Sequence, residues 1–141
     1  MKKFFMTFAI VAVFALTGCG KSEKTLTCTQ SEDDTKATVN LTFKKDKMTK
    51  VDMVVDIDIS GEDYSEEDLA YLNEMFGIAC IAYTGDGVDC NTNVTAKAAT
   101  MKVVIDVEKA SSSTLKELEL EETYTYQKAK DELTADGYTC K

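Results

Sequence analysis

The chain contains no histidine, no proline and no tryptophan, and every basic residue in it is a lysine. Without histidine, the sequence lacks the commonest general base of enzymes and the commonest metal ligand. Without arginine, it lacks the planar guanidinium group that binds phosphates and carboxylates through two parallel hydrogen bonds. These absences weigh against metal centres and against catalysis that depends on histidine.

The acidic balance of the chain excludes a further class of partner. The 141 residues include 16 basic and 25 acidic side chains, for a net charge of −9. Loss of the first 18 residues would remove Lys2 and Lys3, so the remaining chain would carry 14 − 25 = −11. A negative field of this size repels phosphate backbones, and we expect no nucleic-acid partner. Lys21 and Lys24 are local exceptions, which soften repulsion from an anionic membrane.

The first residues have the pattern of an export signal. Lys2 and Lys3 precede an apolar run over residues 4–16, which only Thr7 interrupts. As a helix this run spans about 20 Å, short of the ~30 Å hydrocarbon core, so it fits a secretory signal better than a membrane-spanning helix. The run ends in Leu16-Thr17-Gly18-Cys19, which resembles the lipobox of bacterial lipoproteins.

These features predict three segments. Residues 1–18 are a signal peptide, residues 19–25 are the lipidated N-terminus with a short tether, and residues 26–141 are a single domain. Cys19 is the predicted site of diacylglyceryl attachment, and acyl chains at this position make attachment nearly permanent. We therefore expect the membrane as a partner through Cys19, with the domain on the extracytoplasmic face of the cell membrane. In a host with two membranes, the outer membrane is an alternative location.

Apolar residues that alternate with polar ones predict several β-strands. The clearest runs from Val51 to Ile59, and a charged connection at residues 44–47 joins it to a strand over residues 39–43. Leu26 and Cys28 suggest a short first strand that a polar turn at residues 31–34 follows. A second hairpin is expected over residues 88–96 and 101–108, and residues 118–120 are either an edge strand or an extended connection.

Two helices are expected between and after these strands. Ser65 and Asp68 resemble a capping box, and a stripe at helical spacing follows them: Leu69, Leu72, Met75, Phe76 and Ala79. We expect this stripe to face the core rather than to form a partner-binding groove. The second helix covers residues 126–133 and stops before Gly137, whereas residues 111–113 are expected to be flexible. The predicted fold class is α+β, with an antiparallel sheet built from hairpins and two helices packed on one face.

The four cysteines beyond Cys19 are expected to form two disulfides, because an even number in an exported domain is typical of structural cross-links. Four cysteines allow three connectivities. We favour Cys28–Cys140, which would join two terminal extended segments, and Cys80–Cys90, which would close the loop around Gly85. The closest pair is ten residues apart, so the short spacings typical of thiol oxidoreductases and tetrathiolate zinc sites are absent.

Other candidate chemistries are weaker. Asp86 and Asp89 could be calcium ligands, but the pattern around them favours a surface turn. Three carboxylates on one strand are expected to form a solvated face, with a weak cation site as the alternative: Asp52, Asp56 and Asp58. The tetrapeptide from Ser113 to Lys116 matches a Ser-Lys catalytic motif only in its letters. The sequence therefore indicates no catalytic residue, no metal site and no cofactor.

The order of lipobox, hairpin, helix, hairpin, helix and a final aromatic residue after glycine resembles the YehR-type small bacterial lipoproteins. The most specific parts are Gly87-Val88-Asp89 and residues 104–109, with Lys45-Asp46-Lys47-Met48 and Gly137-Tyr138 in support. The resemblance implies an α+β sandwich on a lipid anchor and brings no catalytic residues. The four additional cysteines depart from the enteric members and place the chain in a cysteine-containing branch.

Three functions are compatible with these observations. The leading hypothesis is a non-enzymatic, membrane-anchored module that binds a protein or small-molecule partner, which the sequence does not identify, or contributes to the cell envelope. The second is a small hydrolase that uses carboxylates and lysine. The third is a purely structural lipoprotein. An exposed apolar patch would favour the first hypothesis, and a pocket with converging carboxylates would favour the second.

Overall fold

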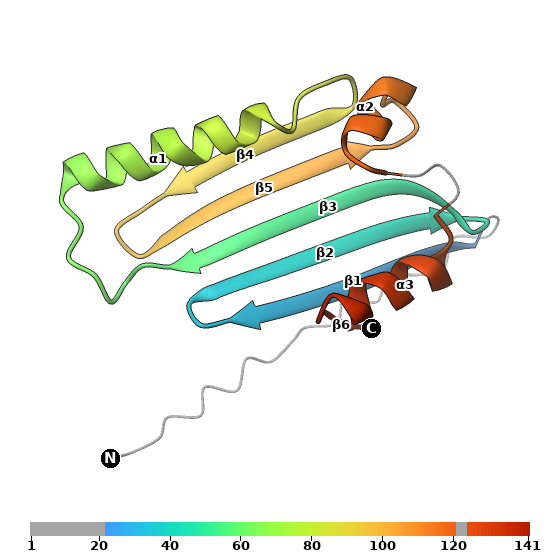
Figure 1. Cartoon of the computed structure of the whole chain (residues 1–141), viewed down its shortest axis with the longest axis horizontal. Helices are drawn as coiled ribbons and strands as arrows, with labels where there is room; N and C mark the ends of the chain where they lie inside the picture. The colour runs from blue at the N-terminus through green and yellow to red at the C-terminus, as the bar shows by residue number, and fades with distance from the viewer. Residues whose placement is uncertain (1–21, 121–123) are drawn as a thin grey trace, which may run out of the picture.

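A computed structural model describes residues 22–120 and 124–141 of the chain (Figure 1). In chain order the elements are β1 (Glu23–Glu32), β2 (Thr35–Lys44), β3 (Lys47–Asp58), α1 (Glu66–Ile81), β4 (Val88–Val94), β5 (Ala98–Asp106), α2 (Ser112–Glu117), α3 (Tyr126–Ala135) and β6 (Thr139–Cys140). The predicted signal peptide, residues 1–18, and the predicted lipid attachment site, Cys19, lie outside the described residues. Within those residues, no helix has the length and apolar character needed to cross a bilayer.

The strands form a six-stranded sheet in the order β4-β5-β3-β2-β1-β6. Every neighbouring pair in it is antiparallel, and the chain is therefore a mixed α+β protein, as the sequence predicts. The first strand is longer than expected, because residues 23–25, which the sequence analysis placed in the tether, already pair with β2. Three hairpins build most of the sheet, and they are formed by β1–β2, β2–β3 and β4–β5.

One face of the sheet carries the core. Val51 of β3 lies between Leu41 of β2 and Ile105 of β5, and all three are buried. The alternation predicted for β3 and β5 therefore places Val51 and Ile105 on the same face of the sheet. The core cluster also includes Leu26, Cys28, Val39, Phe43, Met48 and Val103.

A β-bulge at Thr49 adjusts the end of the β2–β3 hairpin. Thr42 pairs with Lys50, but Phe43 pairs with Met48, so Thr49 is an extra residue in β3. In a regular strand, Met48 and Val51 would point to opposite faces, because they are three residues apart. The bulge lets both side chains enter the core, where each is nearly inaccessible.

The structure contains three helices in the described residues, not two. The additional helix is α2, which begins in the serine-rich segment, so the prediction that residues 111–113 are flexible is wrong. The Ser111 side chain accepts a hydrogen bond from the Thr114 backbone N–H at the start of this helix. Leu115 of α2 and Ala129 of α3 are both buried in the core cluster. Burial of Leu115 explains why a polar segment is helical here: a single apolar anchor holds the turn against the sheet.

The expected strand or extended connection at residues 118–120 is also not formed. The Leu118 N–H donates to the Thr114 carbonyl and the Leu120 N–H to the Leu115 carbonyl, so these residues finish the turn of α2. Glu119 has a φ of 56°, in the left-handed region that commonly ends a helix. The prediction was wrong because two leucines between glutamates fit an edge strand and a helix end equally well.

The expected disulfide pairings are both present. Cys28 is joined to Cys140 and Cys80 to Cys90. Cys28 and Cys140 face each other in neighbouring strands, whereas the second bond links the end of α1 to β4. One disulfide therefore links β1 to the edge strand β6, and the other links α1 to the opposite edge strand, β4.

Candidate functional site

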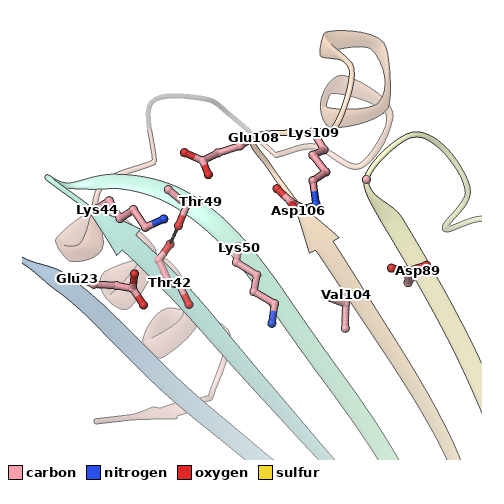
Figure 2. Close-up of a pocket in the computed structure, with 11 residues that line it drawn as sticks. Glu23, Thr42, Lys44, Thr49, Lys50, Asp89, Val104, Asp106, Glu108 and Lys109 are labelled. Carbon is pink, nitrogen blue, oxygen red and sulfur yellow. Dashed lines mark hydrogen bonds and ion pairs between the residues drawn. The ribbon is translucent and has the colours of Figure 1, made fainter. Parts of the chain in front are cut away.

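A shallow open depression of about 480 Å³ lies on the face of the sheet opposite the core, near the end of β5 (Figure 2). Strand alternation explains its polar lining. Lys50 precedes the buried Val51, and Asp106 follows the buried Ile105, so both side chains point away from the core. The lining consists of Glu23, Thr42, Lys44, Thr49, Lys50, Gly87, Asp89, Val104, Asp106, Glu108 and Lys109.

Opposite charges pair within this surface. The Lys109 Nζ lies 2.8 Å from an Asp106 carboxylate oxygen. The hydrogen bond from Lys109 holds the pKa of Asp106 below its usual value, and the same bond raises the pKa of Lys109. A general acid at neutral pH needs a carboxyl pKa that is raised, so the shift at Asp106 runs in the direction opposite to that requirement.

The three carboxylates of β3 each have their own contacts. Asp52 lies 3.5 Å from the Lys102 Nζ and 4.0 Å from the Lys50 Nζ, and it belongs to the charged sheet face. Asp56 accepts a hydrogen bond of 2.8 Å from the Thr100 hydroxyl. Asp58 accepts one from the Ser60 backbone N–H at the strand end, and its pKa is lowered by hydrogen bonds from Ser60. These contacts fit the expected polar face, and each of the three carboxylates has different partners.

Of the two residues proposed as possible calcium ligands, one lies inside a tight turn and the other lies on the strand that follows it. Asp86 sits between Gly85 and Gly87, both of which have positive φ, and Asp89 is on β4. A Cβ on Gly87 would lie 2.7 Å from the Asp106 carbonyl oxygen, so glycine permits close approach to the end of β5. Across residues 22–120 and 124–141, no group of three or more Cys, Asp or Glu side chains is arranged to hold a metal ion.

The Ser113–Lys116 pair lies on α2, where Ser113 contributes to the helix start. Its hydroxyl lies 2.8 Å from the Ser111 hydroxyl, and Ser111 in turn caps the Thr114 backbone N–H. These contacts make Ser111 the cap of the helix and place Ser113 in a hydrogen bond with that cap.

A second candidate surface is the outward face of α1, which we define as Tyr71, Met75, Ile78 and Ile81. These side chains are 63%, 50%, 60% and 67% exposed, respectively. Their spacing of three or four residues places them along the helix, away from the side that contacts β4 and β5. In the described residues this is where large apolar side chains are most exposed, with Tyr64 just before the helix.

The outward face corrects the expected core stripe of α1. Leu69, Leu72 and Phe76 are half-buried, but Met75 and Ala79 are exposed, and no residue of α1 is fully buried. The predicted stripe does not include the apolar residues beside it, Tyr71, Ile78 and Ile81. Their signal is present in the sequence, because the helix is apolar around most of its circumference.

Two solved structures share this fold. The NMR structure of the YehR protein of Escherichia coli matches with a TM-score of 0.64 and 20% identity, over 86% of this chain and 92% of that one. The NMR structure of a protein from Streptococcus pneumoniae TIGR4 matches with a TM-score of 0.53 and 14% identity, over 100% of this chain and 97% of that one. No protein-family model and no curated protein sequence matches the chain. At these identities the likeness concerns the fold: the chain has a YehR-like α+β fold.

Proposed function

We propose that this chain is a lipid-anchored, extracytoplasmic and non-enzymatic module that binds a protein partner through the outward face of α1. Membership in the YehR-type lipoproteins is part of the proposal, and the lipobox at Cys19 together with the YehR-like fold supports it. We also propose that the helices cover one face of the sheet and leave the opposite, polar face open. Leu115, Ala129 and the bond at Cys90 support this arrangement, because all three belong to the core side.

The observation that carries the proposal is the exposed apolar strip on α1. Scattered single apolar side chains are ordinary on a protein surface, but a continuous row along one helix marks an interaction site. Tyr71, Met75 and Ile78 follow the spacing that a helix uses to contact one partner. Tyrosine and methionine are enriched at the centres of protein interfaces, and methionine adapts its shape to a partner.

Charge identifies the kind of partner that fits. α1 contains no basic residue, and the helix begins with three acidic ones, Glu66, Glu67 and Asp68. Glu74 lies within the same helix, so carboxylates border the N-terminal part of the apolar strip. A protein segment with apolar side chains flanked by lysine or arginine would complement both features. An anionic lipid surface or a second copy of this acidic helix would meet repulsion instead.

The hydrolase hypothesis gains no support from the polar depression. Its carboxylate Asp106 is paired with Lys109, and the pKa of that carboxyl is lowered rather than raised.

Site-specific photo-crosslinking in cells tests the proposal. A photoreactive amino acid replaces Ile78 in the full-length chain, and Asn91, which is exposed on β4, is the matched control position. We expect position 78 to crosslink one protein, through a segment whose apolar residues are flanked by lysine or arginine. The pair Glu67→Lys and Glu74→Lys should reduce the yield several-fold, whereas Glu32→Lys with Asp34→Lys, which makes the same change in net charge, should not.

Three results would contradict the proposal. Crosslinks only between copies of this chain would make α1 a self-association surface. Crosslinks only to lipid would make it a membrane contact. Equal yields at positions 78 and 91, or none at either, would leave the structural lipoprotein as the better account.

A further inference from the structure

One end of the sheet is strongly acidic, and the opposite end carries charges of both signs with one lysine-rich turn. The β1–β2 turn, the end of β3 and the start of α1 lie at one end of the strands, on the left of Figure 1. The Asp58 backbone N–H donates to the Asp34 carbonyl there, which joins two of these segments. This acidic end carries Glu32, Asp33, Asp34, Asp58, Glu62, Asp63, Glu66, Glu67 and Asp68, with Lys36 and Lys97 as the nearby basic residues.

At the opposite end of the sheet, the turn between β2 and β3 is rich in lysine. Lys44 ends β2, Lys45 lies in the connection and Lys47 begins β3, and they surround a single acid, Asp46. The Asp46 carboxylate lies 3.9 Å from the Lys24 Nζ. Among the residues that the structure describes, the three lysines of this turn form no ion pair. We call residues 44–47 the lysine turn.

Acidic groups also lie at this end, and they limit the positive region to the turn itself. Asp106 is paired with Lys109 at 2.8 Å, and Glu23 and Glu108 line the same depression. The turn therefore carries a net positive charge of 3 − 1 = +2, while the chain as a whole carries −9. A domain with this asymmetry is oriented by an external field.

The backbone of the lysine turn adds a second observation. Lys45 and Asp46 have φ values of 51° and 58°, so both central residues of the hairpin turn are left-handed. Asparagine and glycine suit such turns best, and lysine is unfavourable there. Lys45 therefore lowers the local stability of the turn, and it places an ammonium group at the extreme end of the sheet.

The start of the domain lies at the same end. Glu23, the first residue of β1, pairs directly with Lys44. Cys19 precedes Glu23 by 23 − 19 = 4 residues, a stretch that covers about 13 Å at most. An acyl chain on Cys19 would therefore hold the lysine turn within reach of the lipid headgroups.

We infer that the lysine turn docks on anionic phospholipid headgroups and holds the strands upright on the membrane, with the acidic end pointing away. The inference rests on the proposed lipid anchor. Each lysine near an anionic surface adds roughly fivefold to its population there, and the acidic end is repelled. α1 runs alongside the strands (Figure 1), so in this orientation its outward face points sideways and stays accessible to a protein.

Amine labelling of the mature lipoprotein in vesicles tests the orientation. The protein is reconstituted in phosphatidylcholine alone and in phosphatidylcholine mixed with phosphatidylglycerol, and the labelling rate of each lysine is read by peptide mass spectrometry. We expect Lys44, Lys45 and Lys47 to react several-fold more slowly in the anionic vesicles, and high salt should remove the difference. Lys36 and Lys97, at the acidic end, serve as internal controls and should react equally in both.

Variants separate docking from the anchor. Lys45→Gln with Lys47→Gln should remove most of the protection at Lys44, whereas Lys36→Gln with Lys97→Gln should leave it unchanged. Flotation with neutral vesicles measures the acyl anchor alone. If the protein floats but the lysines of the turn are labelled equally in both lipids, the docking inference is wrong and the lipid anchor is supported. Failure to float in either lipid would overturn the anchor, and the inference with it.

Discussion

Cys28 of β1 and Cys140 of β6 occupy directly opposed positions in the sheet, and a disulfide joins them. Beside them, Thr27 and Lys141 exchange both backbone hydrogen bonds, at 3.1 and 2.9 Å. The C-terminal end is thereby held on the strand that begins four residues after Cys19. A two-residue strand is too short to hold by hydrogen bonds alone, so the covalent bond explains why β6 is ordered beside β1.

The two disulfides should differ in their contribution to stability. Cys28–Cys140 spans a sequence separation of 112 residues and Cys80–Cys90 one of 10. Loop-closure entropy predicts about 5 kcal/mol for the first bond and about 3 kcal/mol for the second. Chemical denaturation of the paired variants Cys28→Ala/Cys140→Ala and Cys80→Ala/Cys90→Ala should show the larger loss in the first pair. Equal losses, or a larger loss in the second, would mean that loop entropy does not dominate.

The lysine turn offers a test of backbone strain. Replacing Lys45 by asparagine and Asp46 by glycine supplies the residues that a type I′ turn prefers. We expect the free energy of unfolding to rise by about 1 kcal/mol. The double variant removes one positive and one negative charge, so its net charge is unchanged. The single variant Lys47→Gln, just outside the left-handed positions, controls for the removal of a lysine from the turn. An unchanged or lower stability of the double variant would show that the native pair is not strained.

Two glycines should respond to alanine in opposite directions. A Cβ at position 87 would lie 2.7 Å from the Asp106 carbonyl oxygen and 2.8 Å from the Ala110 nitrogen, at a φ of 76°. Gly87→Ala should therefore destabilise the domain by about 2 kcal/mol. Gly77 lies inside α1 with open space around it, and Gly77→Ala should stabilise by about 0.5–1 kcal/mol. Thermal unfolding of both variants checks the pair, and shifts of the same sign would contradict it.

The capping box of α1 makes stability depend on pH. Hydrogen bonds from the Ser65 side chain and backbone lower the pKa of Asp68 in the folded state. A carboxyl with a lowered folded pKa stabilises the fold above its unfolded pKa, and this contribution is lost as the pH falls through the folded value. Asp68→Asn should therefore reduce the loss of stability below about pH 4.

A charge-matched variant controls this experiment. Asp63→Asn removes one carboxylate just before α1 and leaves the capping box intact. Urea denaturation at acid and neutral pH compares the two variants. If Asp63→Asn flattens the pH dependence as much as Asp68→Asn does, general charge repulsion and not the capping box is the cause.

Local patterns in the sequence predicted most of the sheet. The alternation around Val51 and Ile105 defines the buried face, and Ser65 with Asp68 marks the start of α1 where the structure has it. The positions of the cysteines in the expected strands and beside the Gly85 loop also led to the pairings that the structure contains. The strand alternation and the capping box are each visible within a few residues of sequence. The Cys28–Cys140 pairing follows from the expectation that both cysteines lie in extended segments.

The missed features depend on contacts that are distant in sequence. α2 is helical because Leu115 is buried against the sheet, and no local periodicity signals that contact. The bulge at Thr49 depends on where β2 and β3 end relative to each other.

The outward face of α1 was missed for a different reason. Both sides of the helix are apolar, and a sequence pattern cannot tell which of two apolar sides contacts the sheet. The polar strand face was expected correctly for Asp52, Asp56 and Asp58, because alternation alone determines it.

The intact mass of the protein purified from its native membrane tests the central claim most directly. A lipid-anchored module predicts a chain that begins at Cys19, carries a diacylglyceryl group on the Cys19 sulfur and retains both disulfides. The variant Cys19→Ser should lose this mass increment and leave the membrane fraction or stay unprocessed. A native chain that begins elsewhere, or that begins at Cys19 without acyl groups, would contradict the account.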